Sequence, residues 1–110
     1  MMTGIEMIVA ERRHQIDGEG WTPEHDDEHT HEELVGAAIC YAANKGVVFD
    51  SRIVVGGDFR APVLYYDSPA WPWDGESDKR AQHGRLRSLA VAGALIAAEI
   101  DRLQRAGVVE

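Results

Sequence analysis

The C-terminal third of the chain constrains the fold most, because its apolar residues recur at the spacing of one helix face. This spacing predicts a single long helix from about Ser77 to Ala106. The expected stripe consists of Leu86, Leu89, Ala90, Gly93, Ile96, Ala97, Ile100 and Leu103. Gly93 stands among alanines, and so small a residue predicts the close approach of another helix, from the same chain or from a second subunit.

Helix start and stop signals divide the N-terminal part of the chain. A Ser or Thr followed three residues later by Glu can form a capping box, and proline suits the first helical turn. The start signals are Thr3 with Glu6, Thr22 with Pro23, and Thr30 with Glu33. The stop signals are Gly18 and Asn44–Gly46, where glycine suits the left-handed end of a helix.

The middle of the chain carries β-branched and aromatic runs on both sides of Gly56-Gly57, which predict a short hairpin. Pro62 restricts that hairpin to an edge position. We therefore expect one domain over residues 1–110 that is mostly α, with three helices, a small β-hairpin insertion and the long C-terminal helix.

Charge excludes some classes of partner. The net charge is −8, and residues 17–33 hold eight carboxylates without one Lys or Arg. Those acids account for the whole excess, so we expect no non-specific binding to nucleic acid, which needs a broad basic surface.

No apolar run reaches the length of a membrane span, and the lone Cys40 predicts a reducing, cytoplasmic compartment.

Three blocks carry a resemblance: "ERRHQIDGEGWTPEHDDEHTHEELVGAAICYA", "WPWD" and "AGALIAAEIDRLQRAG". In this order they resemble a family of small, uncharacterised phage and prophage proteins, which implies a phage origin and the host cytoplasm. The family commonly has a run of arginines before the third block, where this chain has "GESDKRAQHGRLRS". The stretch "EGWTPEHDDEHTHEEL" is also similar to the ryanodine-receptor repeat domain, without its expected glycine. Bacterial and phage relatives of that domain are proposed to bind nucleotide-derived ligands.

The histidine-rich acidic stretch at 19–34 allows three interpretations. Its carboxylates can meet the positive ends of two helices and pair with Arg12 or Arg13, which is a structural role. It can line a polar ligand pocket, with His25 and Asp27 inward and Glu24 and Asp26 in solvent. It can also hold a divalent metal, as in a metal-dependent nucleotide pyrophosphohydrolase. The ligands in that alternative are His25, Glu28, His29 and Glu33.

Aromatic and basic residues suggest a second part of a ligand site. Tryptophan beside proline often packs a loop onto a core, but it also offers a stacking face for a planar base. Arginines nearby would hold phosphate. The expected ligand-binding residues are Trp21, His25, Asp27, Trp71, Trp73, Arg80, Arg85 and Arg87.

Together these features predict a non-enzymatic protein that binds a small nucleotide-derived molecule without a cofactor. Its use would be to sequester a host anti-phage defence signal. The metal-dependent pyrophosphohydrolase is one alternative, and an acidic inhibitor or scaffold that binds a basic host partner is another. We also expect a homo-oligomer formed through the Ala/Gly face around Gly93.

Overall fold

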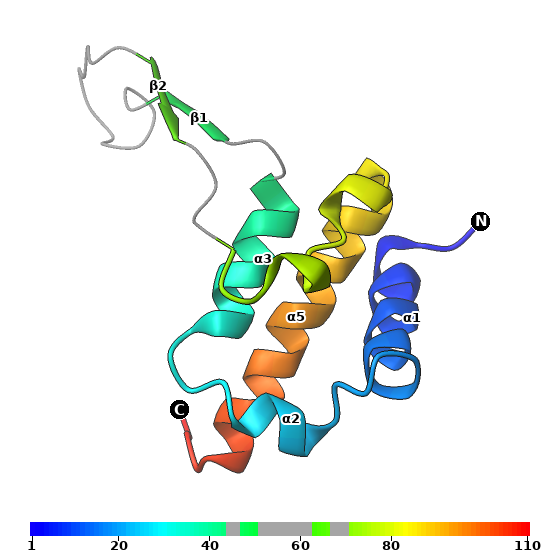
Figure 1. The fold of residues 1–110 in the computed structure, drawn as a ribbon, viewed down its shortest axis with the longest axis vertical. Coiled ribbons are helices and arrows are strands. Elements are labelled where there is room, and N and C mark those ends of the chain that lie inside the picture. Colours follow the sequence, from blue (N-terminus) through cyan, green and yellow to red (C-terminus); the bar gives the residue numbers. More distant parts are fainter. Residues whose placement is uncertain (44–46, 51–62, 67–70) are drawn as a thin grey trace.

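The computed structural model of the chain describes residues 1–43, 47–50, 63–66 and 71–110. Its helices are α1 (Gly4–Asp17), α2 (Pro23–Asp27), α3 (Glu33–Ala43) and α5 (Arg85–Arg105), and its strands are β1 (Val47–Asp50) and β2 (Val63–Tyr66). The mostly α-helical fold is confirmed. Helix α5 lies between α1 and α3, and α2 crosses its C-terminal end (Figure 1). None of the described helices is long and apolar enough to cross a membrane.

The first two helix starts are those that the sequence predicts. The Thr3 hydroxyl accepts the Glu6 backbone N–H (3.2 Å), and the Glu6 carboxylate accepts the Thr3 N–H (2.8 Å), which makes the expected capping box. Gly18 caps the other end of α1. Helix α2 begins at Pro23, and the Thr22 hydroxyl accepts a backbone N–H of its first turn.

The capping box expected at Thr30 is wrong. Helix α3 begins at Glu33, so this residue occupies the first helical position and not the third. Its carboxylate reaches back into the preceding loop, where it accepts the His31 backbone N–H and pairs with the His29 ring. Glu32 turns the chain into the helix with a φ of 65°.

The long helix starts eight residues later than expected, at Arg85. Two short 3-10 turns, Gly75–Ser77 and Arg80–Gln82, precede it. The Asp78 carboxylate accepts both the backbone N–H and the guanidinium of Arg80, which holds a tight turn in place of an α-helical one. Gly84 then occupies the N-cap of α5.

The buried face of α5 differs from the expected stripe. Its side chains Val91, Leu95 and Ala98 pack against α3. The main cluster consists of Leu34, Ala37, Ala38 and Tyr41 from α3 and Val91, Ala92, Leu95 and Ala98 from α5. The expected stripe residues Leu86, Leu89, Ile96 and Ile100 are exposed. The helix is apolar almost all round between Ser88 and Ala98, so its periodicity could not distinguish the two faces.

The close approach predicted at Gly93 occurs within the chain. A Cβ placed on Gly93 would lie 2.7 Å from Cδ1 of Ile8 in α1. The alanines beside it, Ala90 and Ala94, are also buried inside the protein. The Ala/Gly face therefore serves the packing of helices of one chain.

The two strands lie beyond the end of α3 (Figure 1). They pair antiparallel, with Val47 opposite Tyr66 and Asp50 opposite Val63. The turn expected at Gly56-Gly57, the edge role of Pro62 and the helix stop at 44–46 all lie outside the described residues.

Candidate functional site

The tryptophans lie together on one side of the helical core. Trp73 meets Trp71 and Trp21 edge to face, at ring-centroid distances of 5.5 and 5.2 Å. Trp71 in turn meets Tyr41 of α3 at 5.6 Å, and its Nε1 donates to the Asp74 carbonyl at 3.0 Å. These contacts anchor the segment that follows residue 70 onto the core and join three segments that are distant in sequence.

Two histidines of the acidic stretch extend this aromatic cluster. The His25 ring stacks on Trp21 (5.3 Å) and lies 4.8 Å from the His29 ring. Nδ1 of His25 lies 3.1 Å from the Asp26 carboxylate, and Nδ1 of His29 lies 3.1 Å from Glu33. A carboxylate therefore orients each imidazole, as is common where a histidine is held in one position.

The inward carboxylate is Asp26, which corrects the expectation that Asp27 points inward. Asp26 is completely buried and accepts a hydrogen bond from Nη2 of Arg12 in α1 at 3.0 Å. Asp27 is half exposed and pairs with Arg105 at 2.8 Å. Neighbouring residues of a helix point about 100° apart, so an inward Asp26 turns Asp27 toward the surface. Glu24 is exposed, as expected.

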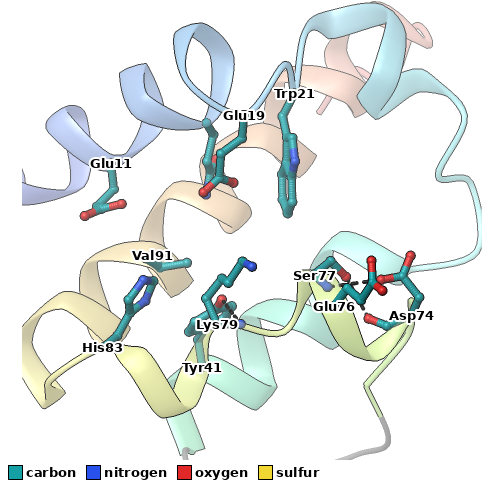
Figure 2. Close-up of a pocket in the computed structure, with 11 residues that line it drawn as sticks. Glu11, Glu19, Trp21, Tyr41, Asp74, Glu76, Ser77, Lys79, His83 and Val91 are labelled. Atoms are coloured by element: carbon teal, nitrogen blue, oxygen red, sulfur yellow. Dashed lines mark hydrogen bonds between the residues drawn. The ribbon is translucent and has the colours of Figure 1, made fainter.

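A cavity of about 360 Å³ lies between α1, α3 and the segment before α5. Figure 2 shows side chains entering it from opposite sides, with Glu19 and Trp21 facing Tyr41 and Lys79. Its walls are formed by Glu11, Gln15, Glu19, Trp21, Tyr41, Asp74, Glu76, Ser77, Lys79, His83 and Val91. Such a volume is sufficient for a small planar ligand.

Gln15 is the most informative residue of this wall. It is 2% exposed, and its Oε1 accepts from Nη1 of Arg12 at 3.3 Å. Its Nε2 has no hydrogen-bond partner among the described residues, although buried polar atoms are nearly always paired. A residue of the cavity wall therefore carries a buried amide nitrogen without a described acceptor.

Two further polar groups of the wall are neutral near pH 7. Burial, reinforced by Arg87, lowers the pKa of His83, whose Nδ1 is also buried without a described partner. Burial raises the pKa of Tyr41, whose hydroxyl oxygen accepts the Lys79 backbone N–H at 3.2 Å. Both rings lie 5.8 Å apart in a stacked arrangement. They provide uncharged hydrogen-bonding groups at the far end of the cavity from Trp21.

The charge of the cavity is acidic, with four carboxylates on its wall and the one ammonium of Lys79. Glu11 is compensated by Nε of Arg87 at 2.8 Å, and Glu19 lies 3.3 Å from the His14 ring. Such an excess of negative charge disfavours an anion and favours an uncharged or cationic ligand.

The three arginines expected to bind phosphate do not line this cavity. Arg80 lies over the Trp71 ring at 5.5 Å, but its guanidinium is held by Asp78 at distances from 2.7 Å. These hydrogen bonds lower the pKa of Asp78 and keep the pair ionised. Arg87 is bound to a glutamate of α1, and Arg85 is exposed at the start of α5.

The metal alternative has no assembled site in the described part of the chain. No group of three or more His, Cys, Asp or Glu side chains there could hold a metal ion. His25, His29 and Glu33 are engaged in the pairs described above, and Glu28 is exposed. The residues present therefore do not fit the metal centre that a pyrophosphohydrolase would need.

Comparisons with protein-family models, curated proteins and solved structures give no match for this chain. Of the expected ligand-binding residues only Trp21 lines this cavity, and Gln15 was not predicted from the sequence. The sequence does contain a signal for Gln15, because Ile8, Arg12 and Gln15 are spaced as residues on one face of a helix. In the structure this face of α1 packs inward.

Proposed function

We propose that this protein binds a small nucleotide-derived molecule through its planar base, without chemical turnover. The base occupies the cavity between α1, α3 and the segment before α5. The observation that carries the proposal is Gln15, a residue of the cavity wall whose buried amide Nε2 has no hydrogen-bond partner in the described part of the chain. A ring nitrogen or carbonyl oxygen of a base is the acceptor that such a donor needs.

The remaining wall suits a base as well. Trp21 offers an aromatic face, and stacking on such a face contributes about 1–3 kcal/mol per base. Asp74 and Glu76 can accept hydrogen bonds from exocyclic amino groups. Stacking and complementary hydrogen bonds are the two interactions by which proteins select a base.

The acidic wall favours ligands that place no phosphate inside the cavity. A phosphate inside the cavity would meet uncompensated carboxylates, while the nearby arginines are already paired. The proposed ligand therefore enters with its base, and any phosphate stays outside. A protein that holds such a molecule intact lowers its free concentration. In a phage-encoded protein, this activity would sequester a base-containing defence signal in the host cytoplasm.

The test is a thermal-shift screen with adenosine, guanosine, cytidine and uridine, each beside its 5′-monophosphate. We expect at least one nucleoside to raise the melting temperature, and its monophosphate to raise it less. The difference should shrink at high salt, because salt screens the repulsion between phosphate and the acidic wall. Chromatography of the heated complex should return the nucleoside unchanged. The absence of any nucleoside shift, a larger shift with monophosphates, or recovery of a converted product would each refute the proposal.

A further inference from the structure

A row of large apolar side chains on α5 has no cover in the described fold. Leu86 is 71% exposed, Leu89 42%, Ile96 50% and Ile100 51%. With Gly93 and Leu103 they follow one another at intervals of 3, 4, 3, 4 and 3 residues. We call these six residues the outer row. This alternation is the heptad spacing by which one helix packs along another.

The outer row is distinct from the face of α5 that builds the core. Val91, Leu95 and Ala98 face α3, and their packing is complete within one chain. No charged residue occurs in α5 between Ser88 and Ala98, so the middle of the outer row is free of charge. A soluble protein rarely exposes so continuous an apolar strip unless another molecule covers it.

We propose that a second copy of this chain covers the outer row, with the two α5 helices antiparallel. Reversal of the row about its centre brings Leu86 opposite Leu103, Leu89 opposite Ile100, and Gly93 opposite Ile96. Large side chains meet at the ends, and in the middle Ile96 meets Gly93 together with the Ile8 side chain that packs against it. The row thus complements itself under the two-fold symmetry of a homodimer.

Charge favours the antiparallel direction. Arg85 lies at the start of α5, is exposed and has no ion-pair partner among the described residues. Exposed acids, Asp101 and Glu110, lie at or beyond the other end of the helix. A parallel pair would bring the two Arg85 side chains together, whereas an antiparallel pair separates them and places each at the end of the second copy that carries Asp101 and Glu110.

Helix α1 adds apolar surface beside the row. Ile8 contacts Gly93, and within one turn of Ile8 the side chains of Ile5 and Val9 are 76% and 43% exposed. The outer row itself extends about 26 Å along α5, from the rise of about 1.5 Å per residue. No residue of the outer row lines the cavity, so this proposal is independent of ligand binding.

The test is the mass in solution, measured by sedimentation equilibrium over a wide concentration range. The wild-type protein should reach twice the chain mass of 12.2 kDa. Ile96→Lys should raise the dimer dissociation constant at least about tenfold, because a buried, unpaired ammonium is costly. Ile39→Lys is the matched control, since Ile39 is 47% exposed but belongs to α3, and it should leave the dimer unchanged. Far-UV circular dichroism should show that both variants keep their helices.

Cysteine pairs test the direction. Oxidation of the Leu89→Cys, Ile100→Cys double variant with copper phenanthroline should give covalent dimers much faster than oxidation of Leu89→Cys alone. A monomeric wild-type protein, or equal association of the Ile96→Lys and Ile39→Lys variants, would overturn the proposal. Equally fast formation of covalent dimers by Leu89→Cys alone would overturn the antiparallel arrangement, because parallel helices place Leu89 opposite Leu89.

Discussion

Replacement of Asp26 by asparagine should destabilise the protein more than the same change one residue later. Asp26 is completely buried, and it is held by Nη2 of Arg12 at 3.0 Å and by Nδ1 of His25 at 3.1 Å. Arg12 is itself 14% exposed, and its Nε has no partner among the described residues. Loss of the carboxylate charge therefore leaves a guanidinium uncompensated in a poorly solvated place. Such a change costs about 3–5 kcal/mol, and the partial exposure of Arg12 favours the lower end.

Asp27→Asn is the matched control. Asp27 is 48% exposed and Arg105 34% exposed, so their pair contributes about 0–1 kcal/mol. The assay is urea unfolding of both variants and the wild type, followed by circular dichroism. With a slope of about 1–3 kcal/mol per molar urea, Asp26→Asn should lower the midpoint by about 1 M or more. Equal losses for the two variants would refute the buried pair, as would the absence of coupling between Asp26→Asn and Arg12→Met in a double-mutant cycle.

Two further predictions follow from shifted pKa values. Arg80 holds the pKa of Asp78 below its ordinary value of 3.8. The ion pair therefore stabilises the fold fully above pH 3.8. This stabilisation is lost as the pH falls through the lower pKa that Asp78 has in the folded protein. The melting temperature of Arg80→Met should therefore fall less steeply with acid than that of the wild type, and equal slopes would contradict this. Burial raises the pKa of the Cys40 thiol, which is completely buried, so Ellman's reagent should react with it only after denaturant is added. Rapid reaction in the folded protein would show that the core around it is open.

Local chemistry made the helix starts predictable. The hydroxyl groups of Thr3 and Thr22 accept backbone N–H groups only three residues away. The capping residue and the helical turn that it caps are therefore both visible in a short stretch of sequence. The same rule failed at Thr30, because the left-handed Glu32 delays the start of α3. The requirement for a small residue at Gly93 was visible too, but its contact turned out to come from the same chain.

Contacts between helices that are distant in sequence determine which face of α5 and which aspartate of α2 are buried, and local sequence patterns do not show these contacts. Helix α5 has two apolar faces, and which of them meets α3 depends on the position of the other helices. The rotation of α2 likewise determines whether Asp26 or Asp27 is buried, and a shift of one residue exchanges them. The sequence indicated which aromatic residue types form the cluster. Gln15 became a candidate only from the structure, which places it on the cavity wall and gives its amide nitrogen no partner among the described residues.

We propose that the buried amide of Gln15 recognises a base in the cavity. Calorimetric titration with the nucleoside that gives the largest thermal shift tests it most directly, on the wild type, Gln15→Met and Gln104→Met. Gln104 provides the same substitution at an exposed position away from the cavity. Loss of one buried hydrogen bond should weaken binding to Gln15→Met about tenfold, which corresponds to about 1.4 kcal/mol, and Gln104→Met should bind like the wild type. Equal affinities for all three proteins would contradict the account.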